Sequence, residues 1–192
     1  SSYVTINFEP TLINKTPIKL EWYDGGLRPS YPSLIPSDTY LGGKRNTNGV
    51  MMIGEEGIIT TNVYGQNPRL FTKDKEVISP KIKNLPKDDW GHQRMWIDAI
   101  KDGYGSSKHK MLTSSFDYAG PMTETVLMGN IAIRSYLLNT NGNPDSVRIT
   151  GKNKNSYYGR RKMTWDGENM KITNFEDANQ FVGRSYREGW EL

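Results

Sequence analysis

Short segments in which apolar and polar residues alternate dominate this sequence and restrict its fold more than any other feature. Residues 3–8 alternate strictly, so their apolar side chains share one face of an expected strand. Residues 18–23 repeat the pattern with Ile18, Leu20 and Trp22 facing inward, and a turn signal, Asp24-Gly25-Gly26, follows. The spacing predicts two half-buried strands that pair antiparallel.

Further hairpins are predicted where apolar runs flank turn residues. Residues 50–53 and 58–64 enclose Gly54-Glu55-Glu56-Gly57, whose glycines permit positive φ, and a second turn follows at 65–68. A last hairpin is expected around Asp166-Gly167-Glu168-Asn169. Residues 27–48 are rich in Pro, Ser and Gly without a period, which predicts a long surface loop, and loops of this length are often functional.

Helical spacing is confined to two segments. One helix is expected near residues 89–101, with Trp96, Ala99 and Ile100 on one face and Gly103 ending it. A longer helix is expected to begin between 117 and 121 and to run towards Leu138, with Pro121 in its first turn. Because apolar residues occupy two sides of this second helix, we expect it to be deeply buried. Two helices among many strands, without βαβα alternation, predict an α+β fold.

Length and composition limit the classes of protein to consider. A chain of 192 residues suits one domain with a sizeable core, so we expect residues 1–192 to form a single domain. The net charge of +4 is too small to indicate a nucleic-acid partner, and no apolar run is long enough to cross a bilayer. We therefore expect a soluble protein with neither partner, while the sequence leaves its compartment, cytoplasmic or periplasmic, open. Without cysteine, the chain has no disulfide and no thiolate site.

Known catalytic motifs are missing from the sequence. No glycine-rich strand-to-helix turn and no Walker motif is present, so the chain has no familiar dinucleotide or phosphate site. His92 and His109 share no spacing suited to a metal ion. Ser107 and Lys110 have the spacing of a serine–lysine pair, but that pair would need a helical turn. Residues 152–162 mix cations with tyrosines, which we interpret as a solvated loop.

The remaining candidates for function are polar residues beside aromatic ones. His92 stands in the first turn of the expected helix, where its side chain can point outward, although a structural role is equally compatible with that place. Aromatic–polar clusters at residues 22–24, 64–69 and 165–166 offer flat apolar faces beside hydrogen-bonding groups, as carbohydrate-binding sites do. Such residues also occur at turns for structural reasons.

Several segments taken together resemble the C-terminal half of the Gfo/Idh/MocA oxidoreductases, particularly a bacterial branch of NADH-dependent dehydrogenase-like proteins typical of the Bacteroidetes. The resemblance covers nearly the whole chain except residues 152–161. The segments are 19–29 (KLEWYDGGLRP), 64–70 (YGQNPRL), 91–103 (GHQRMWIDAIKDG), 116–121 (FDYAGP) with 123–127 (TETVL), 165–170 (WDGENM) and 186–190 (YREGW).

The resemblance implies a domain with a large, mainly antiparallel open β-sheet and helices on one face, the glyceraldehyde-3-phosphate-dehydrogenase-like C-terminal fold. In that family this domain shapes the substrate site and mediates oligomerisation, while an N-terminal Rossmann domain holds NAD(P); the substrates are sugars, cyclitols or their derivatives. The family's catalytic lysine lies in a Glu-Lys-Pro segment that this sequence lacks, and its Asp/His pair would lie before Ser1. No catalytic role can therefore be carried onto a residue of this chain, which we expect to be inactive alone.

Four residues are predicted to form the wall of a carbohydrate site. His92 could hydrogen-bond a substrate hydroxyl, Arg69 and Arg28 could anchor an acidic or polyol group, and Tyr64 could stack on a sugar face. Expected partners are the Rossmann domain and, through the sheet face, further copies of the chain. Two other readings stay open: a non-catalytic carbohydrate-binding or scaffolding module, and part of an NAD-dependent glycosidase of the same superfamily.

Overall fold

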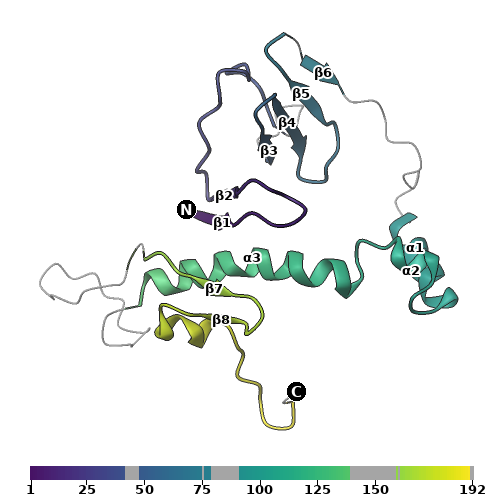
Figure 1. The fold of residues 1–192 in the computed structure, drawn as a ribbon, viewed down its shortest axis with the longest axis vertical. Coiled ribbons are helices and arrows are strands. Elements are labelled where there is room, and N and C mark those ends of the chain that lie inside the picture. Colours follow the sequence, from purple (N-terminus) through teal and green to yellow (C-terminus); the bar gives the residue numbers. More distant parts are fainter. Residues whose placement is uncertain (42–47, 75, 79–90, 139–158, 160, 191–192) are drawn as a thin grey trace, which may run out of the picture. The chain divides into compact units, whose positions relative to one another are not determined.

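The computed structural model describes residues 1–41, 48–74, 76–78, 91–138, 159 and 161–190. These residues form two compact units (Figure 1). The continuous unit is Arg28–Asp98, and the discontinuous unit combines Ser1–Leu27 with Ala99–Leu192. The expectation that residues 1–192 form a single domain stays a prediction.

The continuous unit contains a four-stranded antiparallel sheet in which the strands follow sequence order (Figure 1). Its strands are β3 (Gly49–Ile53), β4 (Ile58–Asn62), β5 (Arg69–Phe71) and β6 (Glu76–Ile78). A small apolar cluster of Ile35, Ile58 and Phe71 is buried beside it, with Tyr31, Leu34 and Met51 packed against it. The β3–β4 hairpin was predicted from the sequence, whereas β5 and β6 were not.

The glycines of the β3–β4 hairpin serve a purpose other than the one expected. Neither Gly54 nor Gly57 has a positive φ. A Cβ atom at Gly57 would instead lie 2.6 Å from the carbonyl oxygen of Phe71 in β5. Gly57 therefore allows two backbones to approach closely. Positive φ occurs in the next turn, at Gly65 and Asn67.

The discontinuous unit begins with an antiparallel pair, β1 (Ser2–Phe8) and β2 (Ile18–Asp24). Val4 lies opposite Trp22, and Val4 is buried. The expected face is confirmed for Val4, but Ile18 and Trp22 were expected inward and are instead more than half exposed. These two residues are exposed because alternation decides which side of a strand a residue occupies, but not what covers that side.

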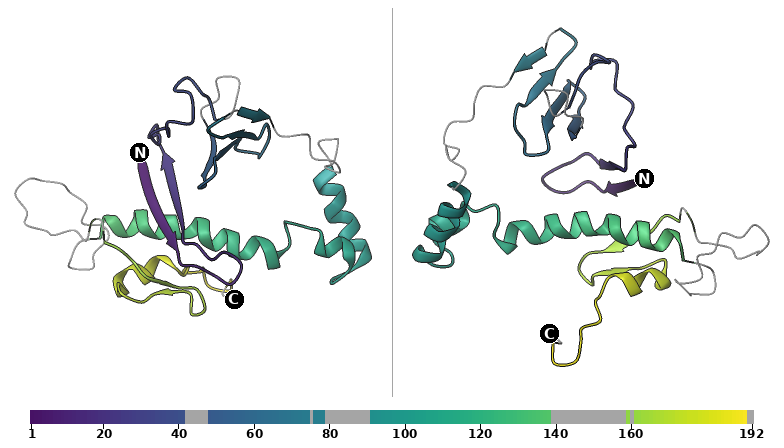
Figure 2. Two further views of the ribbon diagram at one scale, coloured as in Figure 1. Left: turned by 45° about the horizontal axis from the view of Figure 1, so that its top comes forward. Right: turned by 180° about the vertical axis from the view of Figure 1, so that it is seen from behind.

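The long helix α3 (Phe116–Tyr136) contacts β1 and the 3₁₀ helix η1 (Glu176–Phe181). Both views in Figure 2 show these elements side by side. The last hairpin, predicted around residues 166–169, pairs β7 (Trp165–Asp166) with β8 (Lys171–Ile172). Because α3 starts at Phe116, Pro121 falls in its second turn rather than its first.

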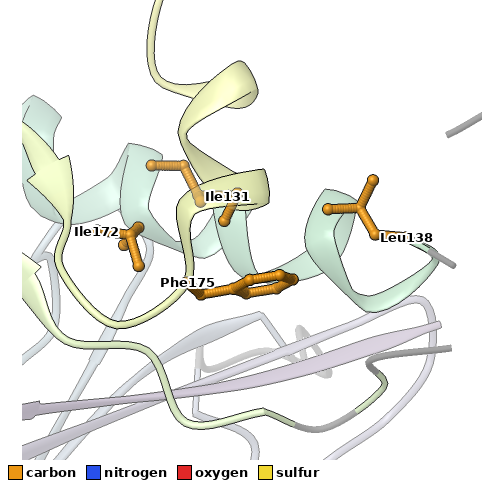
Figure 3. Packing of buried hydrophobic residues seen from close by; sticks show 5 residues of the cluster. Ile131, Leu138, Ile172 and Phe175 are labelled. Carbon is orange, nitrogen blue, oxygen red and sulfur yellow. The ribbon is translucent and has the colours of Figure 1, made fainter. Parts of the chain in front are cut away.

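The core of the discontinuous unit joins the C-terminal end of α3 to the segment after β7. Figure 3 shows Phe175 between Ile131 of α3 and Leu138, which follows the end of the helix, with Ile172 on the other side of Ile131. The buried members are Ile131, Leu138, Ile172, Phe175 and Ala178.

The expectation that α3 is deeply buried is wrong, because Ile131 and Ser135 are its only buried residues in the described structure and even Leu127, on the other apolar side, is 51% exposed. Tyr118, Met122, Val126, Ile133 and Tyr136 are exposed on the described structure. These residues lie within one face of the helix by their spacing. We call this set the outer face of α3.

Two helices precede α3. α1 (Gly91–Asp102) agrees with the expected helix, and Gly103, with φ of 90°, ends it by donating its N–H to the Ala99 carbonyl oxygen at 3.0 Å. Ala99 is buried, whereas Trp96 and Ile100 from the same expected face are exposed. The short α2 (Ser107–Lys110) was predicted as a loop.

The structure confirms that the chain combines α-helices with antiparallel β-strands, as the α+β prediction requires. The sheets formed by the described residues have four, two and two strands, so these residues show no large open sheet.

Candidate functional site

The loop that precedes β3 encloses a surface hollow of about 330 Å³. It falls within the stretch of Pro, Ser and Gly that the sequence marks as a functional loop. Arg28, Pro29, Tyr31 and residues 37–40 line it. All of these residues belong to the continuous unit. We call this feature the loop hollow.

Two successive turns give the loop a defined shape. The N–H of Ile35 donates to the Pro32 carbonyl oxygen at 3.0 Å, and the N–H of Thr39 donates to that of Pro36 at 3.0 Å. The Tyr31 hydroxyl closes the loop by donating to the Thr39 carbonyl oxygen at 2.9 Å. The buried Ile35 side chain then attaches the loop to the core beside the sheet. Proline restricts the backbone at both turns, so little conformational freedom is left to lose when a ligand binds.

Arg69 supports the loop from β5. Its Nη2 donates to the carbonyl oxygen of Tyr40, a lining residue, at 2.7 Å. The guanidinium also lies 5.5 Å from the centre of the Phe71 ring, within the range of a cation–π contact. Arg69 does not line the hollow itself, but its hydrogen bond holds the backbone of Tyr40, which does.

The polar side chains of the loop hollow have few partners in the chain. Arg28, Ser37 and Asp38 are exposed, and the described structure shows no hydrogen bond or ion pair made by their side chains. A guanidinium, a carboxylate, hydroxyl groups and two tyrosine rings thus surround a concave surface. This arrangement suits a small polar ligand that both donates and accepts hydrogen bonds.

The structure places two of the four predicted site residues at this loop. Arg28 lines the hollow and Arg69 fixes its Tyr40. Tyr64 lies in the β4–β5 turn and is 84% exposed, and His92 is the exposed second residue of α1. Neither of these two is a lining residue, and their roles stay predictions.

The Tyr64 turn is rigid although its tyrosine is exposed. Asn62 Oδ1 accepts hydrogen bonds from the backbone N–H groups of Tyr64 at 2.9 Å and Gln66 at 2.8 Å. An Asn side chain that binds the backbone in this way fixes the turn.

Five lining residues, Tyr31 and residues 37–40, could not be predicted as site residues from the sequence. Their sequence neighbours show no motif or period, and only the two proline turns bring them together. The one available signal was the length and composition of the loop.

Other candidates from the sequence are not assembled into a site. Ser107 and Lys110 do lie on the helical turn α2, but the described structure shows no hydrogen bond between them. His109 contacts the Tyr104 ring, with centroids 4.5 Å apart, and accepts from the Gly105 N–H at 3.4 Å. Most of residues 152–162 lies outside the described residues. Among the described residues, no group of three His, Asp or Glu side chains could hold a metal ion.

One carboxylate has a clear electrostatic environment. The Asn169 side-chain amide and backbone N–H both donate to Asp166, at 2.9 and 3.1 Å, and they lower the pKa of this carboxyl group below its ordinary value. The position, in the turn of the β7–β8 hairpin, indicates a structural role.

Comparison of the chain with protein-family models, curated proteins and solved structures finds no match. Of the helices that the structure describes, none combines the length and the apolar character needed to span a membrane.

Proposed function

We propose that this chain is the substrate-binding and oligomerisation domain of an NAD(P)-dependent oxidoreductase acting on a sugar, a cyclitol or a derivative of one. The observation that carries the proposal is the loop hollow, where Arg28 and unpaired polar side chains stand beside tyrosine rings. The hollow lies partly in the segment 19–29, one of those that resemble the Gfo/Idh/MocA oxidoreductases. Polar groups beside aromatic faces are what a carbohydrate requires for binding.

The proposal includes the fold of this family: in the whole protein, the strands would belong to a large, mainly antiparallel open sheet. NAD(P), bound by a Rossmann domain, would supply the hydride chemistry. The residues of this chain would hold and orient the hydroxyl groups of the substrate, with Arg28 at the hollow and Arg69 maintaining the position of Tyr40.

Exposed apolar side chains support a role that depends on further polypeptide. Trp22 on β2 is 56% exposed and Met122 on α3 is 54% exposed. Apolar side chains gathered on one face of an element are typical of surfaces that other protein covers. Both the Rossmann domain and further copies of the chain fit this requirement.

Two observations test the proposal. The coding sequence upstream of Ser1 should contain a glycine-rich strand-to-helix fingerprint. The 192-residue chain alone should show no change in nicotinamide fluorescence when it is titrated into NADH, while a longer protein that includes the fingerprint should.

Two results would overturn the proposal, and each would point to a different conclusion. An unrelated domain upstream of Ser1 would favour a non-catalytic carbohydrate-binding module. NADH binding by the 192-residue chain itself would show that cofactor binding does not belong to a separate Rossmann domain.

A further inference from the structure

We propose that the loop hollow selects a hydroxylated carboxylate, that is, a sugar acid such as a uronate or an aldonate, over a neutral sugar. The inference deepens the proposed function, because it rests on a carbohydrate-type ligand and specifies its charge. It is carried by the two ionised side chains of the hollow, Arg28 and Asp38.

Arg28 provides the charge preference. Among the described residues that line the hollow it is the one cation, and no partner for its guanidinium is seen among them. Arg69, the nearby second arginine, already donates to the Tyr40 carbonyl oxygen. A guanidinium binds a carboxylate through two parallel hydrogen bonds, a geometry that a neutral hydroxyl group cannot reproduce.

Asp38 adds a requirement for hydroxyl groups. An ionised carboxylate only accepts hydrogen bonds, so a ligand beside Asp38 must donate to it. Adjacent hydroxyl groups of a sugar acid can do so while its carboxylate binds Arg28, whereas acetate has no hydroxyl group to donate and phosphate places more negative charge beside Asp38. No ion pair joins Arg28 to Asp38 in the structure, so both groups are available to a ligand.

The size of the hollow restricts the ligand further. At about 330 Å³ it lies near the lower end of the range of ligand sites, roughly 300–1,000 Å³. One sugar ring or one short open-chain polyol fits this range better than an oligosaccharide. The rings of Tyr31 and Tyr40 offer the apolar surface on which the C–H face of such a ligand can stack.

The test is a titration of the full chain with D-glucuronate, methyl glucoside, acetate and inorganic phosphate, followed by saturation-transfer NMR. We expect D-glucuronate to bind more tightly than the three other probes. Arg28→Gln should weaken glucuronate binding about tenfold, the effect of losing one charge-assisted pair at an exposed site. Asp38→Asn should weaken glucuronate binding but leave acetate binding unchanged or stronger.

Arg184→Gln is the matched control, because Arg184 is an exposed arginine of the discontinuous unit. It should leave glucuronate binding unchanged. Equal binding of methyl glucoside and glucuronate, tighter binding of phosphate, or an equal loss in Arg28→Gln and Arg184→Gln would each overturn the inference. Circular dichroism of each variant checks that the fold is retained, and Arg28→Lys repeats the test with the charge kept but the planar fork removed.

The inference and the proposed function can fail separately. If glucuronate binds through Arg28 and no cofactor domain is encoded upstream, the sugar-acid site stands and the oxidoreductase proposal falls. If a cofactor domain is present but the protein turns over glucuronate no better than a neutral sugar, and Arg28→Gln leaves glucuronate turnover unchanged, the sugar-acid site falls and the oxidoreductase proposal stands.

Discussion

At Gly57 the backbone of a neighbouring strand leaves no room for a side chain. A Cβ atom there would lie 2.6 Å from the Phe71 carbonyl oxygen. Gly57→Ala must therefore push β5 away from the start of β4. We expect a loss of about 1–3 kcal/mol in the free energy of unfolding, measured by urea denaturation.

Gly54→Ala is the control within the same hairpin turn. Its Cβ atom would meet only the Gly57 carbonyl oxygen, at 3.6 Å, an ordinary contact distance. We expect this variant to be close to the wild type in stability. If both substitutions cost the same, the close approach of backbones is not what requires glycine at position 57.

A second effect at the scale of one residue concerns Asp166 and pH. Hydrogen bonds from Asn169 hold the pKa of Asp166 below its ordinary value of 3.8. Because the folded pKa is the lower one, the stabilisation is present above the unfolded pKa and is lost as the pH falls through the folded pKa. A carboxyl titration by NMR should show this low pKa, and Asn169→Ala should raise it. An unchanged pKa in Asn169→Ala would contradict the assignment of its cause.

At the scale of elements, a side-chain hydrogen bond links α3 to the last hairpin. The Trp165 Nε1–H donates to Glu124 Oε1 at 2.6 Å, and both residues are half-buried. Glu124→Ala removes a charged acceptor, and we expect it to cost about 1–2 kcal/mol in thermal or urea unfolding. Glu124→Gln keeps an acceptor oxygen and should cost less.

A double-mutant cycle with Trp165→Phe identifies the partner. The cost of Glu124→Ala should shrink in the Trp165→Phe background, because the bond is already absent there. Additive costs would show that Glu124 stabilises α3 by another route.

The elements also show how far the sequence predicts the fold. β1 to β4, α1 and α3 were anticipated, because their periods and turn residues are local properties of the sequence. β5 and β6 were missed, since a strand of three residues is too short to display an alternating period. The exposure of Trp22 and Met122 could not be predicted, because burial depends on what packs against a face.

The candidate site follows the same rule. Arg28 and Arg69 stood out because each lies in a segment that resembles the Gfo/Idh/MocA oxidoreductases, 19–29 and 64–70, and the structure places both at one loop. Asp38 and Tyr40 have no such neighbours, and only the two turns of the loop bring them to the hollow. The sequence could therefore predict residue types suited to a ligand, but not the concave surface that gathers them.

At the scale of the whole molecule, exposed apolar faces on both β2 and α3 predict self-association. We expect light scattering of the purified chain to show an oligomer that dissociates on dilution. If the sheet face mediates contact, Trp22→Glu should weaken association, whereas Met122→Glu on the outer face of α3 should have a smaller effect. A monomer at high concentration would contradict the prediction.

The discontinuous unit has a consequence for the order in which the chain acquires structure on the ribosome. β1 contacts α3, yet the whole of Arg28–Asp98 is translated between them. At roughly 5–20 residues per second, the hairpin waits on the order of ten seconds for its helix. During that interval β1, with its apolar Val4, lacks the helix that contacts it in the folded chain. All strands of the continuous unit lie within Arg28–Asp98, so this unit can fold before α3 is synthesised and the hairpin is packed.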